Sequence, residues 1–312
     1  MMKLSIGASL ALAVLIGLIV LYQAGNRETL SAAQFRADSG YLEAQLGDGV
    51  TAYQISGPET GPVVIVIHGG TLGSLAYQAY VPPLVKAGYR VVVYDQYGRG
   101  FSDRPKAALT IDLMRHQLRE LMDYLQIKQA NLFGVSFGGA ILARFGAMHP
   151  ERVSALAYQV PVIEGASVGL TGKLVAMPII GQLLSRYVAI PSIIARGESF
   201  GTQTEEARRV VAHFTEQFNV QGTERMMRDL LLGDALSSRM GDHVTLGASG
   251  LPAQFVYATD DPEIKAAQVE AALAHYAAPE VHRYTGGHFF SSGKTEELAA
   301  KLDGFFARSK PR

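Results

Sequence analysis

Short runs of apolar residues alternate with helix-length segments along most of this chain of 312 residues. Two of the clearest are Val63 to Ile67 (VVIVI) and Arg90 to Asp95 (RVVVYD), in which the apolar residues are consecutive. Consecutive apolar residues are typical of a strand buried on both faces, as in a parallel sheet. The signal recurs in NLFGV at 131–135, SALAYQV at 154–160 and QFVYA at 254–258. The pattern predicts an α/β protein with a mostly parallel central sheet and helices on both faces.

Two other segments depart from this alternation. Residues 41–57 contain the runs YLEAQL and VTAYQISG around Gly47-Asp48-Gly49, which predicts a β-hairpin. Residues 160–252 lack strand runs, although connections in α/β units normally take only ~2–6 residues. We expect a helical cap insertion at 160–252, with the core formed by 41–159 and 253–312. One long crossover connection with a surface excursion is the alternative.

The amino terminus has the composition of a membrane segment. No charged residue occurs from Leu4 to Asn26, and an apolar helix of roughly 19 residues spans about 28 Å, close to the thickness of a bilayer core. We expect an anchor at 1–26 and a linker at 27–40. A cleaved signal is the alternative, although its best cleavage site, Ser31-Ala32-Ala33, lies well beyond the apolar end. A core helix of a soluble protein is a third interpretation.

The charges around this segment bear on its orientation. Lys3 precedes it, whereas Arg27 and Glu28 follow it, so there is a weak bias toward an amino terminus inside the cytoplasm. With that orientation the folded body lies outside the cytoplasm, anchored to the membrane. If the segment is cleaved, the body is secreted.

Composition narrows the range of partners. The 28 basic residues balance the 28 acidic residues, so no overall field attracts nucleic acid, and none is expected as a partner. The chain has no cysteine, which excludes disulfides, thiolate metal ligands and a cysteine nucleophile. No residue cluster has metal-ligand spacing, and no glycine loop has the phosphate-binding pattern, so neither a metal nor a cofactor is expected.

Ser136 is the candidate nucleophile. It lies between glycines in GVSFGGA, residues 134–140, and the surrounding segment predicts a strand, a tight turn and a helix. In that context Gly134 and Gly138 permit close approach of backbone and helix, which leaves the serine hydroxyl exposed above the sheet. The other interpretation is that Ser136 only caps the helix.

A serine hydroxyl needs a general base, and the base needs an orienting carboxylate. Asp260 and Asp261 follow the strand run at 254–258, and His288 follows the run VHRY at 281–284. The residues themselves leave both aspartates open as the acid. His288 is the histidine on a loop beyond the last strand and is therefore the candidate base. Three others fall in cap or helix segments and are expected at the surface: His213, His243 and His275.

With these motifs the sequence resembles the α/β-hydrolase superfamily of serine hydrolases from about Tyr41 to Arg308. It also matches that family's HGG turn, at His68 to Gly70, and its loop motif D-x-x-G-x-G-x-S, which begins at Asp95. The resemblance implies that Asp261 rather than Asp260 is the acid, since it closes the family's G-x-x-D pattern. It also implies that the backbone N–H groups of Gly70 and Phe137 form the oxyanion hole. Asp95 and Ser102 are then expected to organise loops.

The resemblance also narrows the reaction. Dehalogenases and epoxide hydrolases of this fold carry aspartate at the position of the nucleophile, in the turn between strand and helix, and dehalogenases use tryptophan to bind the halide. In this chain Ser136 occupies that position, and tryptophan is absent. We therefore expect a carboxylesterase or monoacylglycerol lipase-like enzyme that acts on small-molecule esters. The apolar first half of the cap, with the anchor, favours an apolar acyl group.

Three other functions stay open. A proline iminopeptidase-like amide hydrolase is one, because the HGG turn and YDQ resemble that family. Such an enzyme also needs cap carboxylates, for which Glu164, Glu198, Glu205 and Glu206 are available. The second is a C–C bond hydrolase of the same fold, and the third is a non-catalytic binding protein on this scaffold.

Overall fold

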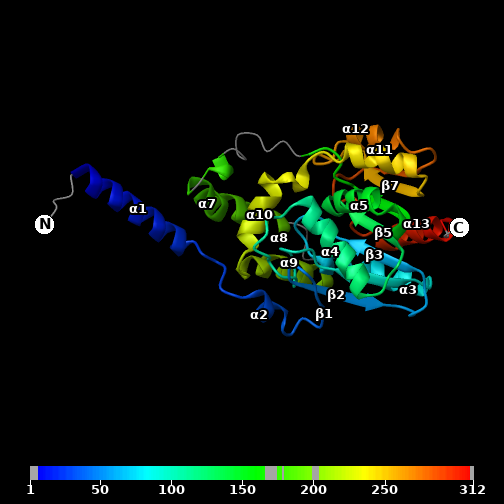
Figure 1. Cartoon of the computed structure of the whole chain (residues 1–312), viewed down its shortest axis with the longest axis horizontal. Coiled ribbons are helices and arrows are strands. Elements are labelled where there is room, and N and C mark those ends of the chain that lie inside the picture. The colour runs from blue at the N-terminus through cyan, green and yellow to red at the C-terminus, as the bar shows by residue number, and fades with distance from the viewer. Residues whose placement is uncertain (1–5, 166–173, 178, 199–203, 310–312) are drawn as a thin grey trace.

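The structure is a computed structural model that describes residues 6–165, 174–177, 179–198 and 204–309. Figure 1 shows a body built around a central sheet, with one long helix, α1, projecting from it. The chain ends at α13, on the side of the body away from α1.

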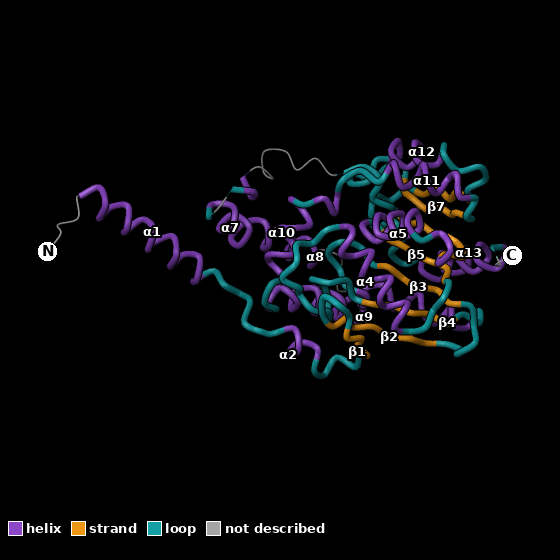
Figure 2. The backbone as a smooth tube through the Cα atoms, in the orientation of Figure 1, coloured by secondary structure: helices purple, strands orange, loops and turns teal. Residues whose placement is uncertain are grey.

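The described residues form an eight-stranded sheet of order β1-β2-β4-β3-β5-β6-β7-β8, which crosses the body in Figure 2. The hairpin β1–β2 is antiparallel, β2 is antiparallel to β4, and every later pairing is parallel. The strands are β1 Leu42–Gln45, β2 Val50–Ser56, β3 Val63–Ile67, β4 Arg90–Tyr94, β5 Ala130–Val135, β6 Val153–Gln159, β7 Ala253–Ala258 and β8 Glu280–Tyr284. The predicted hairpin and the mostly parallel sheet are therefore confirmed.

Helices cover both faces of the sheet. The connections β3 to β4 and β4 to β5 cross the sheet in opposite directions, so right-handed crossovers put α3 and α4 on opposite faces. The terminal helix α13 packs with α3, whereas α5 packs with both α4 and α11. Helix α11 spans Met240–Ser249. The other helices around the sheet are η1 Ser74–Tyr80, α3 Val81–Lys86, α4 Ile111–Tyr124, α5 Phe137–Met148, α12 Ala266–Leu273 and α13 Thr295–Arg308.

The described part of the segment between β6 and β7 consists mainly of helices joined by short turns. Its helices are α7 Ile180–Leu184, a π-helical turn Ser185–Ala189, α8 Ile190–Glu198, α9 Glu205–Glu216, α10 Thr223–Leu232 and α11 Met240–Ser249. Residues 166–173, 178 and 199–203 of the predicted cap lie outside the described residues. Helix α11 packs on α5, with Leu246 against Gly146. Helix α11 of the predicted cap therefore lies against a core helix, and the boundaries at 160 and 252 stay a prediction.

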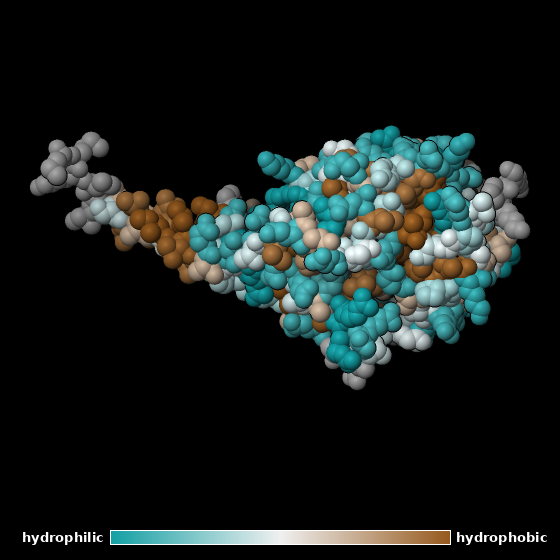
Figure 3. Space-filling model, turned by 90° about the horizontal axis from the view of Figure 1, so that it is seen from below, coloured by the Kyte–Doolittle hydropathy of each residue, from teal (hydrophilic) through white to brown (hydrophobic). Residues whose placement is uncertain are grey.

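Helix α1, Ile6–Ala24, is exposed along its length and forms the brown projection in Figure 3. Among the described residues it is the one helix long and apolar enough to cross a membrane, and a signal sequence has the same properties. Lys3 lies outside the described residues. A short helix α2, Ala32–Arg36, follows, and Ser31 caps it with a reciprocal contact to Gln34.

Candidate active site

Ser136 forms the turn between β5 and α5. Its backbone has φ +52° and ψ −116°, a conformation that costs a non-glycine residue about 1–3 kcal/mol and persists where the surroundings impose it. Its N–H donates to the Gln159 carbonyl at 2.9 Å, while its own carbonyl accepts from Gly139 at 2.9 Å and Val162 at 3.0 Å. The strand–turn–helix predicted for this serine is therefore present, and Ser136 is partly exposed between buried neighbours.

The glycines around Ser136 allow α5 to begin directly against the sheet. A Cβ on Gly138 would overlap the Ile67 carbonyl oxygen, and one on Gly134 would lie 2.6 Å from the Gly138 carbonyl oxygen. Any larger residue would push the helix away from β3 and β5. The close approach inferred from the sequence is thus a steric requirement of this turn.

His288 and Asp261 form a buried pair on neighbouring loops. His288 Nδ1 lies 2.8 Å from Asp261 Oδ2, and Asp261 Oδ1 accepts from the Glu263 and Ile264 N–H groups at 2.8 and 3.0 Å. Burial acts to raise the pKa of Asp261, but the hydrogen bonds from His288 and the two N–H groups outweigh it and lower this pKa. Asp261 is therefore an ionised partner that holds the Nδ1–H of the imidazole.

Asp260 accepts hydrogen bonds from the backbone of the His288 loop. Its exposed carboxylate accepts the N–H groups of Gly286 at 3.0 Å and Gly287 at 3.0 Å, which lower its pKa. These contacts hold the loop that carries His288. The structure brings Asp261, and not Asp260, to His288.

Ser136 and His288 line the same cavity, which has a volume of about 590 Å³. In the part of the chain that the structure describes, Ser136 Oγ makes no hydrogen bond with the His288 ring. Such contacts are often loose without substrate and tighten in the substrate complex. Most of the side chains around the cavity are apolar, among them Leu72, Ile193, Phe214, Leu230, Leu231 and Phe289.

Gly70 and Phe137, the predicted oxyanion donors, lie next to each other at this cavity. A Cβ on Gly70 would be 3.4 Å from the Phe137 Cβ, and one on Gly69 would be 3.6 Å from the Ser136 Cβ. Within the described residues, neither the Gly70 nor the Phe137 N–H donates a hydrogen bond. Their role as an oxyanion hole stays a prediction that this proximity to Ser136 permits.

His68 fixes the peptide that carries the Gly70 N–H. Its Nε2 accepts from the Gln96 N–H at 2.9 Å, so Nδ1 carries the proton and donates to the Gly69 carbonyl at 2.7 Å. Because C=O and N–H point in opposite directions in a trans peptide, this bond directs the Gly70 N–H away from His68. Burial lowers the pKa of His68 to about 4, which keeps the ring neutral. Sequence reasoning assigned His68 only to the glycine turn and missed this role.

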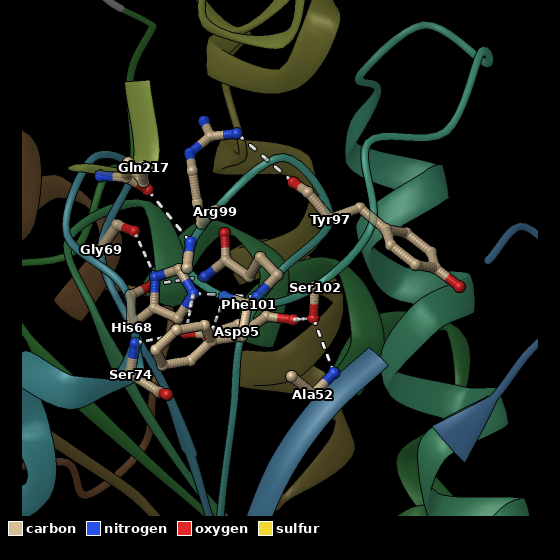
Figure 4. A network of polar contacts seen from close by, with 12 residues as sticks. Ala52, His68, Gly69, Ser74, Asp95, Tyr97, Arg99, Phe101, Ser102 and Gln217 are labelled. Atoms are coloured by element: carbon tan, nitrogen blue, oxygen red, sulfur yellow. Dashed lines mark hydrogen bonds and ion pairs between the residues drawn. The ribbon is translucent and has the colours of Figure 1, made fainter. Parts of the chain in front are cut away.

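Figure 4 shows the polar network behind this turn. Arg99, fully buried, donates to the Gly70 carbonyl at 2.6 Å, and burial lowers the pKa of Arg99 to about 9. Asp95 accepts from the Ser74 and Phe101 N–H groups at 2.7 and 2.9 Å, and Ser102 Oγ donates to the Asp95 carbonyl at 2.5 Å. The predicted loop-organising role of Asp95 and Ser102 agrees with these contacts.

Two of the three histidines expected at the surface are buried. His243 in α11 is fully buried, its Nδ1 lies 2.8 Å from the Tyr276 hydroxyl, and burial lowers its pKa to about 3. His213 in α9 is also buried, and its ring packs against those of Phe35 and Phe101. The expectation was wrong because these helices pack on partners distant in sequence. His275 is exposed, as expected.

The described residues contain no cluster of three or more His, Asp or Glu side chains suited to a metal ion. The arrangement resembles that of a nucleophile, a carboxylate and a histidine, in that chain order, on an α/β sheet, with two backbone N–H groups beside the nucleophile. Fold and candidate site together match the arrangement of the α/β-hydrolase class.

Comparisons with known proteins agree with this class. A family model described as alpha/beta hydrolase fold matches residues 62–189. The chain thus has the α/β-hydrolase fold, and its residues 62–189 match that family. The enol-lactonase from Burkholderia xenovorans LB400 superposes with a TM-score of 0.71 over 85% of this chain and 100% of its own, at 18% identity. A structure from a study of carboxylesterases of Nitrososphaera gargenis gives 0.67 over 86% and 98%, at 20% identity.

Curated relatives match in sequence over a shorter span. The 2-hydroxy-6-oxo-6-phenylhexa-2,4-dienoate hydrolase of Comamonas testosteroni is 34% identical over 159 residues, which are 48% of this chain and 52% of that protein. A haloalkane dehalogenase of Mycobacterium marinum is 32% identical over 106 residues, 33% of this chain and 36% of that protein. The matched part of the chain thus spans about half of the length of these relatives, or less.

Proposed function

We propose that this protein is a serine hydrolase that cleaves carboxylic esters through an acyl-enzyme on Ser136. The observation that carries the proposal is the 2.8 Å contact between His288 and Asp261 at the cavity that Ser136 lines. Ser136 is the nucleophile, His288 the general base and acid, and Asp261 the orienting carboxylate.

The chemistry follows from these roles. His288 Nε2 takes the Ser136 hydroxyl proton as Oγ attacks the ester carbonyl carbon, and the carbonyl oxygen becomes an oxyanion. The N–H groups of Gly70 and Phe137 stabilise that charge, each donor being worth about 3–4 kcal/mol. The alcohol then leaves with the proton from His288. Water, activated by His288, releases the carboxylic acid and restores Ser136.

The cavity favours an apolar acyl group. Its apolar side chains come from the core loops and from the helices between β6 and β7, which we propose act as a cap. The salt bridge between Arg196 of α8 and Glu263, two residues beyond Asp261, links this cap to the loop of the acid. An uncharged ester, of the kind that a carboxylesterase or a monoacylglycerol lipase-like enzyme hydrolyses, suits such a lining better than a charged substrate.

We further propose that α1 is an uncleaved anchor that holds the body outside the cytoplasm. The helix is exposed and long enough to cross a bilayer. Secretion after cleavage of a signal is the alternative.

C–C bond hydrolysis is the second candidate. It is favoured by the sequence similarity to the Comamonas testosteroni hydrolase described above, which is named for a dienoate substrate. Haloalkane dehalogenation is disfavoured, because Ser136 occupies the position where those enzymes carry aspartate, and the chain has no tryptophan.

A single assay separates these activities. The full chain and a Ser136→Ala variant are given p-nitrophenyl esters from acetate to palmitate, a prolyl arylamide and a 2-hydroxy-6-oxo dienoate. Ester turnover that rises toward longer acyl chains and is lost in the variant supports the proposal. Turnover of the dienoate alone supports the C–C hydrolase, and turnover of the prolyl amide alone would make cap glutamates the specificity site.

A further inference from the structure

Large apolar side chains are exposed together on one part of the cap, residues 174–188. The described residues outside α1 include 11 large hydrophobic side chains that are exposed, and six of them fall in this stretch. They are Leu174, Met177, Ile179, Ile180, Tyr187 and Val188, exposed by 39% to 55%. We call these six residues the α7 patch. A group of exposed large apolar side chains so close in the sequence is a candidate interaction surface.

The α7 patch lies at the carboxyl end of α1. The Tyr187 hydroxyl donates to the Leu21 carbonyl at 2.5 Å, and Arg186 donates to the Tyr22 carbonyl. The Arg186 guanidinium also lies 3.8 Å from the centre of the Tyr22 ring. In Figure 1, α7 is the part of the body beside α1. The patch therefore continues the apolar surface of α1 onto the cap.

The residues at this junction suit a membrane–water boundary. Tyr22 and Tyr187 have apolar rings with polar tips, and such side chains gather at the level of lipid headgroups. Arg186 is buried against Glu224 at 2.7 Å, which holds the π-helical turn to α10. The junction is thus a fixed contact that sets the height of the patch relative to the end of α1.

We propose that the α7 patch rests in the interfacial layer of the same bilayer that α1 crosses. A bilayer is the occupant that continuity with α1 favours, because a membrane around the helix reaches the patch without any rearrangement. Amphipathic segments bind a membrane in this way by burying their apolar side chains near the headgroups. The inference rests on the proposed anchor.

The position of the patch has a consequence for the proposed ester hydrolase. Helix α7, the π-helical turn and α8 follow one another without a break from Ile180 to Glu198, and Ile193 and Arg196 of α8 line the cavity. One helical segment thus contacts the membrane at its first end and the cavity at its second. This arrangement gives an apolar ester dissolved in the bilayer a short path to Ser136.

The test uses the full chain in lipid nanodiscs that hold one copy each, made of phosphatidylcholine and phosphatidylglycerol. Because the chain has no cysteine, single cysteines at Val188, Leu15 and Tyr124 carry a nitroxide label without further changes. Tyr124 on α4 is the matched control, since it is exposed by 51% on the core. Power saturation compares collisions with oxygen, which enters lipid, and with a nickel chelate, which stays in water.

We expect the labels at Leu15 and Val188 to favour oxygen and the label at Tyr124 to favour nickel. If Leu15 favours oxygen and Val188 behaves like Tyr124, the anchor stands and the patch proposal is overturned. If Leu15 also favours nickel, the anchor fails and the patch proposal fails with it. A second preparation has two copies in each disc. Protection of Val188 from nickel in that preparation alone would assign the patch to a second copy and overturn the lipid assignment.

Hydrolysis separates this inference from the proposed function. A Val188→Glu variant is assayed on a soluble acetate ester and on a long-chain ester embedded in vesicles. We expect an unchanged rate on the soluble ester and a fall of about fivefold on the embedded ester, since the substitution removes an apolar side chain that the interfacial layer would bury. A variant that hydrolyses both substrates at the same rates as the unchanged chain would contradict the inference. Absence of ester turnover in the unchanged chain would instead refute the proposed function.

Discussion

His288 Nδ1 lies 2.8 Å from Asp261 Oδ2, and this contact joins the loop after β7 to the loop after β8. The carboxylate is buried and also accepts two backbone N–H groups, so its position and ionised state are both fixed. A carboxylate held in this way keeps the Nε2 atom of the imidazole free to accept a proton.

The adjacent aspartates allow a matched test of the acid. We expect Asp261→Asn to lower kcat by about 10⁴, because an amide favours the wrong tautomer of the histidine. Asp260→Asn should change kcat far less, since Asp260 holds only the backbone of the His288 loop. Steady-state kinetics on the best p-nitrophenyl ester measure both. A larger loss in Asp260→Asn would reverse the assignment.

The turn that carries Gly70 depends on His68. Replacing His68 by Leu removes the donor to the Gly69 carbonyl, and we expect kcat to fall by about 10²-fold with little change in KM. His275→Leu is the control, because His275 is exposed. Equal losses in kcat and in folded protein, followed by thermal unfolding, would mean that His68 serves stability alone.

Buried neutral histidines make the stability of the fold depend on pH. Burial lowers the pKa of His68 to about 4 and that of His243 to about 3, below the ordinary value of 6.5. Below pH 6.5 the unfolded chain therefore binds more protons than the folded chain, and the free energy of unfolding falls as pH falls toward these values. Each group contributes a slope of about 1.4 kcal/mol per pH unit.

His243→Asn isolates one of these groups, because the amide retains a polar atom near the Tyr276 hydroxyl and does not titrate. Urea unfolding between pH 7 and pH 5 should give a shallower decline for the variant than for the unchanged chain. The same slope in both proteins would show that His243 does not stay neutral in the folded state.

Substitutions at two glycines test how tightly the turn at Ser136 packs against the sheet. Gly138→Ala should destabilise the fold by several kcal/mol or abolish folding, because its Cβ overlaps the Ile67 carbonyl. Gly241→Ala, in α11 with nothing within 4 Å of the new Cβ, should instead raise stability by up to about 1 kcal/mol. Thermal unfolding compares the two variants. A harmless Gly138→Ala would contradict the close approach of α5 to β3.

Much of the core could be predicted because its signals are local. The consecutive apolar residues of β3 and β4 are buried on both faces, and the turn at Ser136 needs glycines at fixed offsets. Because β5, β7 and β8 run in the same direction, Ser136 after β5 lies at the same edge of the sheet as the loops after β7 and β8.

What the sequence did not reveal depends on contacts between distant segments. His243 is buried because α11 packs on α5, and His213 because Phe35, from the segment after α1, covers it. The choice between Asp260 and Asp261 depends on the path of one loop, since both carboxylates accept hydrogen bonds there. The role of His68 depends on Gln96, which lies on a different loop.

The role of Ser136 as the nucleophile is tested most directly by the intact mass of the protein after reaction with a fluorophosphonate probe, followed by location of the adduct. We expect one probe per chain, attached at Ser136, and no adduct in the Ser136→Ala variant. An adduct on another serine, or unchanged labelling of the variant, would contradict the assignment of Ser136 as the nucleophile.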